Sequence, residues 1–147
     1  MAARQCLLVA ATPMGYVHAR RALHHRFDLV SAFSTHQALA SLRSGGIDAI
    51  VCSIHFDESR MFDLLTAARE LAPDTPVVCC RILHSPLSPR AIEALITTVQ
   101  SLGCRQFVDF NELYRSQGQD EADRRLCEAV VESVAPTPER KTATTGL

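Results

Sequence analysis

Short apolar runs alternate with amphipathic stretches along the chain, and this alternation predicts the secondary structure. Five runs have the length of strands, and they cover residues 6–11, 27–33, 47–52, 76–80 and 104–110. The first, third and fourth runs are almost continuously apolar, as strands buried on both faces are. We therefore expect these three at the centre of a sheet and the two weaker runs at its edges.

Between the runs, apolar residues recur at spacings of three and four, which is typical of helices with one buried face. Helix starts are indicated where a Ser or Thr precedes a proline or stands three residues before a glutamine. These sites are Thr12-Pro13, Ser34 with Gln37, and Ser88-Pro89. Helix ends are indicated at Gly45, Pro73 and Gly103, and a last helix is predicted over residues 120–134 after a polar break at 117–119.

The repetition of strand and helix predicts an α/β fold. Because parallel crossovers are short and right-handed, the helices should cover both faces of a parallel sheet. The burial pattern favours the flavodoxin-like strand order 2-1-3-4-5 in a three-layer domain. We expect one domain over residues 1–134 and a disordered tail over 135–147, which has no apolar period.

The composition narrows the classes of protein to consider. A chain of 147 residues with a formal net charge of -1 fits one globular domain and disfavours a nucleic-acid or membrane-surface partner. No apolar run approaches the roughly 20 residues of a membrane helix, and the first is too short for a signal peptide, which predicts a cytoplasmic location. The only lysine is Lys141 in the tail, and no glycine-rich loop follows the first strand, so a phosphate-binding loop is excluded.

Four segments resemble the strands of response-regulator receiver domains. Residues 6–13 are similar to the family's first strand, which ends in acids before a proline, and 47–53 resemble its third strand, which ends in the phospho-accepting aspartate. Residues 75–81 resemble the fourth strand, which ends in a hydroxyl residue, and 103–107 the start of the fifth, ahead of a Lys-Pro pair. The resemblance spans roughly residues 5–134 and implies the receiver fold.

The positions that carry the family's chemistry hold other residues in this chain. The acid pair is replaced by Ala10 and Ala11, the phospho-acceptor by Ser53, the hydroxyl by Arg81, and the lysine by Phe110, or by Asp109 if the register slips by one residue. Two methyl groups offer no oxygen ligand to Mg²⁺, and without a metal a phosphoryl donor meets no neutralising charge. These replacements imply a pseudo-receiver without phosphorylation, catalysis, metal or cofactor.

Arg81 is the most informative replacement, because an unpaired buried guanidinium is costly. Two interpretations are open: Arg81 fills the vacated pocket and pairs with Asp109 or Asp57, or it turns out to solvent. Phe107 matches the family's mobile aromatic, and its alternative is an ordinary half-buried residue of an edge strand. The resemblance implies a partner surface on this side of the domain, which would include Phe107 and Asp109.

The cysteines and histidines form no metal motif. The six cysteines include no C-x-x-C pair and lie within apolar runs, where thiols usually behave as small buried hydrophobes. His55 and His84 lie near the strand ends with Cys52 and Cys80, but both thiols are expected to point into the packing layers, so we predict no metal site.

These patterns favour a non-enzymatic signalling domain that binds a protein: a histidine kinase, another regulator or a second copy of the chain. The alternative is a sensor domain that responds to a small molecule or to redox state through the altered pocket or the cysteines. A flavodoxin-like enzyme is the third class, and the strand ends offer it no nucleophile with a base and no paired carboxylates.

Overall fold

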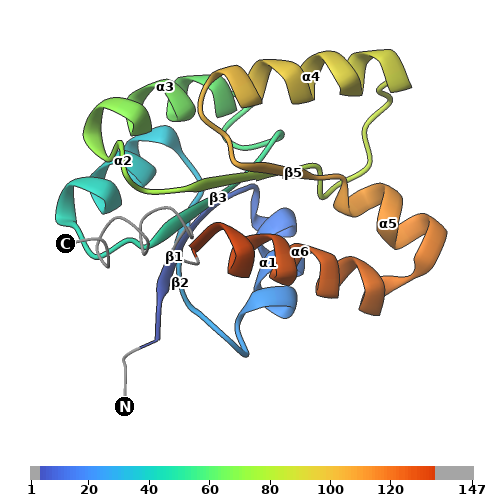
Figure 1. Ribbon diagram of the computed structural model, residues 1–147, viewed down its shortest axis with the longest axis horizontal. Helices are drawn as coiled ribbons and strands as arrows, with labels where there is room; N and C mark the ends of the chain where they lie inside the picture. Colours follow the sequence, from blue (N-terminus) through green and yellow to red (C-terminus); the bar gives the residue numbers. More distant parts are fainter. Residues whose placement is uncertain (1–3, 135–147) are drawn as a thin grey trace, which may run out of the picture.

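The computed structural model describes residues 4–134, in which helices cover both faces of one sheet (Figure 1). The elements are β1 (Cys6–Ala10), α1 (Pro13–Leu23), β2 (Asp28–Ala32), α2 (Thr35–Ser44), β3 (Ala49–Ser53), α3 (Met61–Leu71), β4 (Val77–Cys80), α4 (Pro89–Ser101), β5 (Gln106–Val108), α5 (Phe110–Gln117) and α6 (Gln119–Val134). Among the described residues, no helix is long and apolar enough to cross a membrane.

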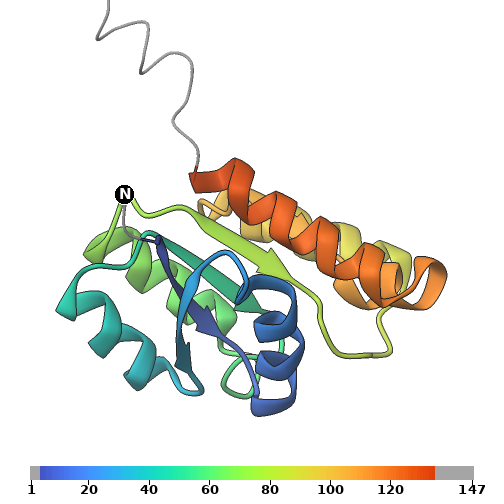
Figure 2. The same cartoon turned by 90° about the horizontal axis from the view of Figure 1, so that it is seen from below.

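The five strands form one parallel sheet in the order β2-β1-β3-β4-β5, so the predicted fold class is confirmed. Helices α2, α3 and α4 lie on one side of the sheet, and α1 and α6 lie on the other (Figures 1 and 2). Alternate residues of β1 explain the two layers, because Leu7 and Val9 join the core under α1 and α6, whereas Leu8 and Ala10 join the core under α2 and α3. All four are completely buried.

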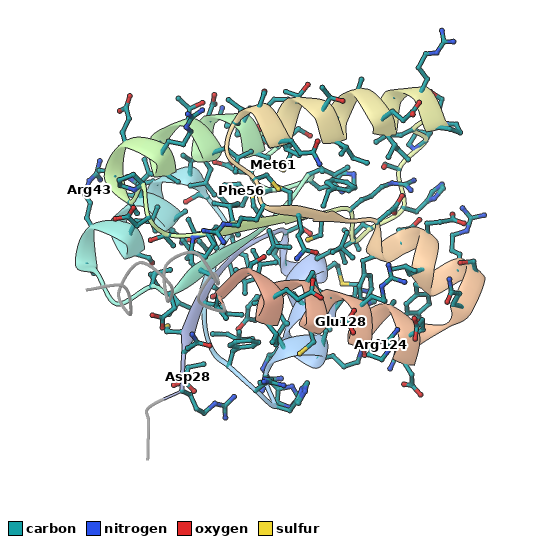
Figure 3. All side chains as sticks on the ribbon, viewed as in Figure 1. Asp28, Arg43, Phe56, Met61, Arg124 and Glu128 are labelled. Carbon is teal, nitrogen blue, oxygen red and sulfur yellow. The ribbon has the colours of Figure 1, made fainter. Side chains whose placement is uncertain are left out.

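The second core layer extends beyond the strands. Phe56, in the loop after β3, and Met61, the first residue of α3, are buried between the sheet and the helices of that side (Figure 3). This buried loop residue anchors the start of α3 close to the carboxyl edge of the sheet.

All three predicted helix starts are confirmed by capping hydrogen bonds. The hydroxyls of Thr12, Ser34 and Ser88 each accept a hydrogen bond from the backbone N–H three residues later, at 3.0, 3.1 and 3.1 Å. The reciprocal bond from Gln37 differs from a capping box, because its Oε1 accepts from the N–H of Phe33 at 2.8 Å rather than from Ser34.

The predicted strand over residues 104–110 is too long at both ends. The strand covers only Gln106–Val108, and Phe110 begins the helix α5, which the sequence pattern did not indicate to us. At the carboxyl end the physical reason is a cap: Asp109 Oδ1 accepts a hydrogen bond from the N–H of Glu112 at 3.1 Å. Gly118, at φ 95°, then separates α5 from α6. The predicted tail at 135–147 lies outside the described residues.

Both edges of the sheet carry polar side-chain contacts. On β5, the Gln106 amide donates to the backbone carbonyl of Ala129 at 3.4 Å and to Glu132 Oε1 at 3.0 Å, both on α6. On β2, Asp28 pairs with Arg4 at 3.5 Å. The outer face of α6 carries a further exposed ion pair, Arg124 with Glu128, at 2.9 Å (Figure 3).

Candidate functional site

The carboxyl ends of the strands bring the predicted site residues to one edge of the sheet. Ala10 ends β1, Ser53 ends β3, Arg81 follows β4, and Phe110 follows β5. Ladder hydrogen bonds continue beyond the strands here, since the Arg81 N–H donates to the carbonyl of Val108 at 3.0 Å. All four residues are buried, and so is Ala11, the residue after β1.

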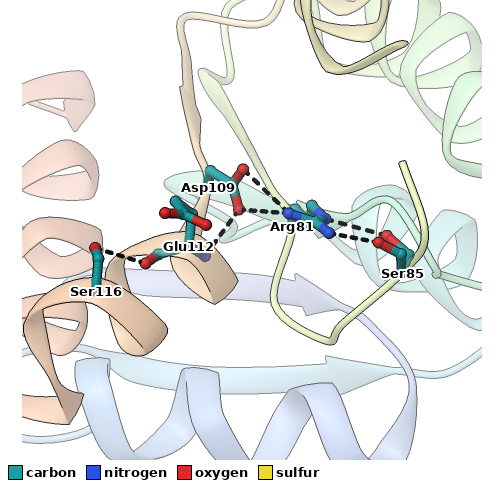
Figure 4. Close-up of polar contacts among 5 residues, drawn as sticks. All are labelled: Arg81, Ser85, Asp109, Glu112 and Ser116. Carbon is teal, nitrogen blue, oxygen red and sulfur yellow. Dashed lines mark hydrogen bonds and ion pairs between the residues drawn. The ribbon is translucent and has the colours of Figure 1, made fainter. Parts of the chain in front are cut away.

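Arg81 is held by two neighbours (Figure 4). Its Nη1 donates to both carboxylate oxygens of Asp109 at 3.3 Å. Its Nε donates to the Ser85 hydroxyl at 3.1 Å, and its Nη2 donates to the Ser85 backbone carbonyl. The Arg81 side chain is 6% exposed and that of Asp109 is 24% exposed. Of the two interpretations from sequence, the structure therefore shows the inward-facing, paired guanidinium.

Asp109 has a second role that couples Arg81 to a helix. The carboxylate oxygen that accepts from Arg81 also caps α5, and the backbone N–H of Asn111 donates to the Arg81 carbonyl at 2.9 Å. Farther along α5, the Ser116 hydroxyl donates to the carbonyl of Glu112 at 2.8 Å (Figure 4). The main chain and the side chain of Arg81 thus both fix where α5 begins. The sequence did contain a signal for this helix, because Asp109 and Glu112 have the spacing of a capping box.

Asp57, the other candidate partner of Arg81, serves a different purpose. Its Oδ2 accepts hydrogen bonds from the backbone N–H and the hydroxyl of Thr35, at 2.7 and 2.8 Å, at the start of α2. These two bonds lower the pKa of the Asp57 carboxyl. Asp57, Glu58 and Ser59 all have positive φ, at 45, 56 and 70°, so the loop after β3 makes a left-handed turn without a glycine.

The resemblance to receiver domains implies a Mg²⁺ ion at this edge of the sheet, but the residues present do not fit one. Ala10 and Ala11 present methyl groups where oxygen ligands would be needed. The nearby carboxylate of Asp109 is already engaged by the positive charge of Arg81. Within residues 4–134, no group of three or more His, Cys, Asp or Glu side chains is placed to hold a metal ion.

Among residues 4–134, no hydrogen bond links the Ser53 hydroxyl to a side chain that could take its proton. Its hydroxyl accepts a long hydrogen bond from the N–H of His55 at 3.4 Å. Burial lowers the pKa of the His55 imidazole, and the positive charge of Arg81 lowers it further. The His55 Nδ1 is buried, with no hydrogen-bond partner among the described residues. A buried donor or acceptor without a partner costs about 1–3 kcal/mol.

Phe107 and Asp109 lie on the same side of the domain. Phe107 is half-buried and packs against the core layer of α2 and α3. Both residues line a groove of about 370 Å³ between β5, α5 and α6, together with charged residues that include Arg125 and Glu128. The structure therefore brings together the two residues that we expected at a partner surface.

The thiols at the strand ends are buried. Cys52 and Cys80 are fully buried in opposite core layers, and the Cys80 thiol donates to the backbone carbonyl of Cys52 at 3.7 Å. Burial raises the pKa of Cys80 to about 12. Elsewhere, a hydrogen bond from the thiol of Cys79 lowers the pKa of Cys104, but both of these side chains are also buried.

The strand order and the two helical layers are those of the flavodoxin-like fold, which solved receiver domains of response regulators share. Solved structures of that class superpose on nearly the whole chain. The N-terminal signal receiver domain of a two-component system response regulator from Bacteroides fragilis has a TM-score of 0.69 at 14% identity, covering 92% of this chain and 100% of that one. The phosphorylated cyanobacterial phytochrome response regulator RcpA has a TM-score of 0.68 at 14% identity, covering 92% and 99%.

A response regulator from Thermotoga maritima has a TM-score of 0.67 at 18% identity, covering 91% of this chain and 100% of that one. At these identities the likeness is one of fold. No family model and no curated protein matches the chain.

Proposed function

We propose that the domain is a signalling module that acts by binding other proteins and is not itself phosphorylated or catalytic. The observation that carries this proposal is the buried guanidinium of Arg81, which is bonded to Asp109 and Ser85 at the edge where a receiver's chemistry takes place. The fold supports a role in signalling, and the RcpA structure is that of a phosphorylated protein. In this chain, the positions where the receiver resemblance implies acids, an aspartate and a lysine hold Ala10, Ala11, Ser53 and Phe110.

Electrostatics supports the absence of phosphorylation. Transfer of a phosphoryl group needs a metal ion or a set of free cationic donors around the transferred oxygens. Ala10 and Ala11 supply neither, and the guanidinium of Arg81 has committed its donors to Asp109 and Ser85. Ser53 also lacks the negative charge that makes an aspartate a phospho-acceptor.

The groove beside β5 is the surface that we assign to the partner. Phe107 offers an apolar contact, and the charged residues around it offer specificity through complementary charge. The partner classes are those expected from the sequence: a histidine kinase, another regulator or a second copy of the chain. A cytoplasmic location and the absence of a nucleic-acid partner are part of the same proposal.

The first experiment exposes the protein to acetyl phosphate or beryllium fluoride with Mg²⁺ and measures intact mass, oligomeric state and amide NMR shifts. A phosphorylatable receiver treated in parallel is the positive control. We expect no added phosphoryl mass and no shift beyond those caused by Mg²⁺ in the control buffer. A phosphoryl adduct on Ser53 or on any other residue of the domain would refute the proposal.

The second experiment tests the assigned surface. Affinity capture from native extract is compared among the unmodified protein, Phe107→Asp and Arg43→Ala, the last being an exposed position on α2. A partner that is retained by the unmodified protein and by Arg43→Ala, but lost by Phe107→Asp, supports the surface. A partner retained equally by all three places binding elsewhere.

A further inference from the structure

A cavity of about 370 Å³ lies between α3 and α4, on the opposite side of the sheet from α1 and α6. Its apolar lining includes Ile54, Met61, Phe62, Leu87, Ala91 and Leu95. This volume falls within the range of about 300–1,000 Å³ that is typical of small-molecule sites. Phe62 and Leu87 are 40% and 37% exposed, so both leave apolar surface open at the cavity.

The charge of the lining distinguishes this cavity from three others formed by the described residues. Its polar members are two serines, a threonine and His55, and it has no Asp, Glu, Lys or Arg. Those three cavities are each lined by both acidic and basic side chains. A charged ligand would lose its hydration here without gaining an ion pair, so the lining selects for a neutral one.

The seating of α4 gives a second, independent observation. In this amphipathic helix only Val99 is fully buried, whereas Ile92, Leu95 and Ile96 remain half-buried. An apolar stripe that is half covered by the domain gains from additional apolar contact. Leu95 and Ala91 present part of that stripe to the cavity.

His55 supplies one polar group of the site. It lines the cavity, and its Nδ1 is the buried nitrogen that has no hydrogen-bond partner among residues 4–134. Because the imidazole is neutral at neutral pH, one ring nitrogen is a donor and the other is an acceptor. A hydrogen-bonding group on the ligand, either a donor or an acceptor, is therefore the chemistry that this residue matches.

We propose that the cavity between α3 and α4 is a binding site for a neutral small molecule with an apolar body and a hydrogen-bonding group, which His55 recognises. The ligand body contacts Met61 and Phe62 from α3 and Ala91 and Leu95 from α4. This site is separate from the groove at β5, and its occupation does not depend on how the domain is otherwise regulated.

The test uses N-phenyl-1-naphthylamine, a neutral aromatic probe with one N–H group that fluoresces strongly only in apolar surroundings. We expect saturable binding of one probe per chain, with a Kd in the micromolar range. Ala94→Phe places a ring at an exposed position of the cavity rim and should weaken binding at least tenfold. Thr97→Phe adds the same ring to an exposed position of α4 outside the cavity and should leave the Kd within about twofold.

Histidine NMR locates the probe. The imidazole signals of His55 should shift on binding, while those of His18, on the other side of the sheet, should not. Absence of saturable binding, equal binding by both Phe variants, or an unshifted His55 would overturn the proposal. So would a concentration-dependent dimer that Ala94→Phe abolishes, because the cavity would then be the contact between two chains. The outcome of the phosphorylation assay does not depend on any of these results, so the two proposals are tested separately.

Discussion

Removing Asp109 should destabilise the domain far more than removing its partner Arg81. Asp109→Ala leaves a guanidinium that is 6% exposed without its counter-ion and also removes the cap of α5. Breaking a buried pair from one side costs about 3–5 kcal/mol, but Asp109 is 24% exposed and Ser85 still binds Arg81, so we expect about 2 kcal/mol for the pair. The lost cap adds about 1 kcal/mol, for a total of about 3 kcal/mol.

The matched variants separate these two contributions. Asp109→Asn keeps a capping side chain and should cost only the part due to charge, about 2 kcal/mol. Arg81→Met replaces the cation with an apolar side chain of similar length and leaves a carboxylate that still reaches water, so we expect a loss of about 1 kcal/mol or less. The double variant Arg81→Met/Asp109→Asn should then be more stable than Asp109→Asn alone.

Urea unfolding followed by far-UV circular dichroism measures these differences, since the chain has no tryptophan to report by fluorescence. With a slope of about 2 kcal/mol per molar, Asp109→Ala should lower the midpoint by roughly 1.5 M. The reasoning is refuted if Arg81→Met costs more than Asp109→Asn, or if the double variant is the least stable of the set.

Three further predictions concern the loop after β3 and the thiols. Glu58→Gly should raise stability by about 0.5–1 kcal/mol in the same urea assay, because it relieves a left-handed residue at φ 56°, and a loss of stability would show that the turn carries no strain. Because the pKa of Asp57 is lowered in the folded state, its carboxylate stabilises the fold above the ordinary carboxyl pKa, and this stabilisation is lost as the pH falls through the lowered pKa. Asp57→Asn should therefore make the free energy of unfolding less dependent on pH in the acid range. An unchanged pH dependence would contradict this reasoning. In native thiol titration only Cys6 and Cys127 should react, slowly because burial raises the pKa of each, and rapid reaction of a third thiol would show that the core opens.

The sheet could be predicted from the sequence because strands that are buried on both faces consist of continuous apolar runs. The runs around β1, β3 and β4 are apolar without alternation. The capping residues before α1, α2 and α4 indicate where these helices begin. α5 was missed because Phe107, Val108 and Phe110 read as the continuation of a strand. The local cap at Asp109 overrides that pattern.

The site was only partly accessible to the same reasoning. The position of Arg81 at a strand end predicts that it needs an acidic partner, but the sequence offered two candidates, Asp109 and Asp57. The choice depends on the loop after β3, where three residues without a glycine adopt positive φ and carry Asp57 toward Thr35. The cavity beside α4 exists because of how closely that helix packs on the sheet. The spacing of apolar residues in the sequence does not indicate this packing distance.

The contacts at the two edges of the sheet limit how the domain can assemble. A free edge strand invites another strand to continue the ladder, in ordered fibres as well as in aggregates. β5 pairs over only three residues, and the Gln106 amide is tied back to α6, while β2 presents the charged pair of Asp28 and Arg4. Recruitment of a partner by backbone addition is thereby discouraged at both edges of the sheet, which leaves recognition to side chains, such as those that line the groove beside β5.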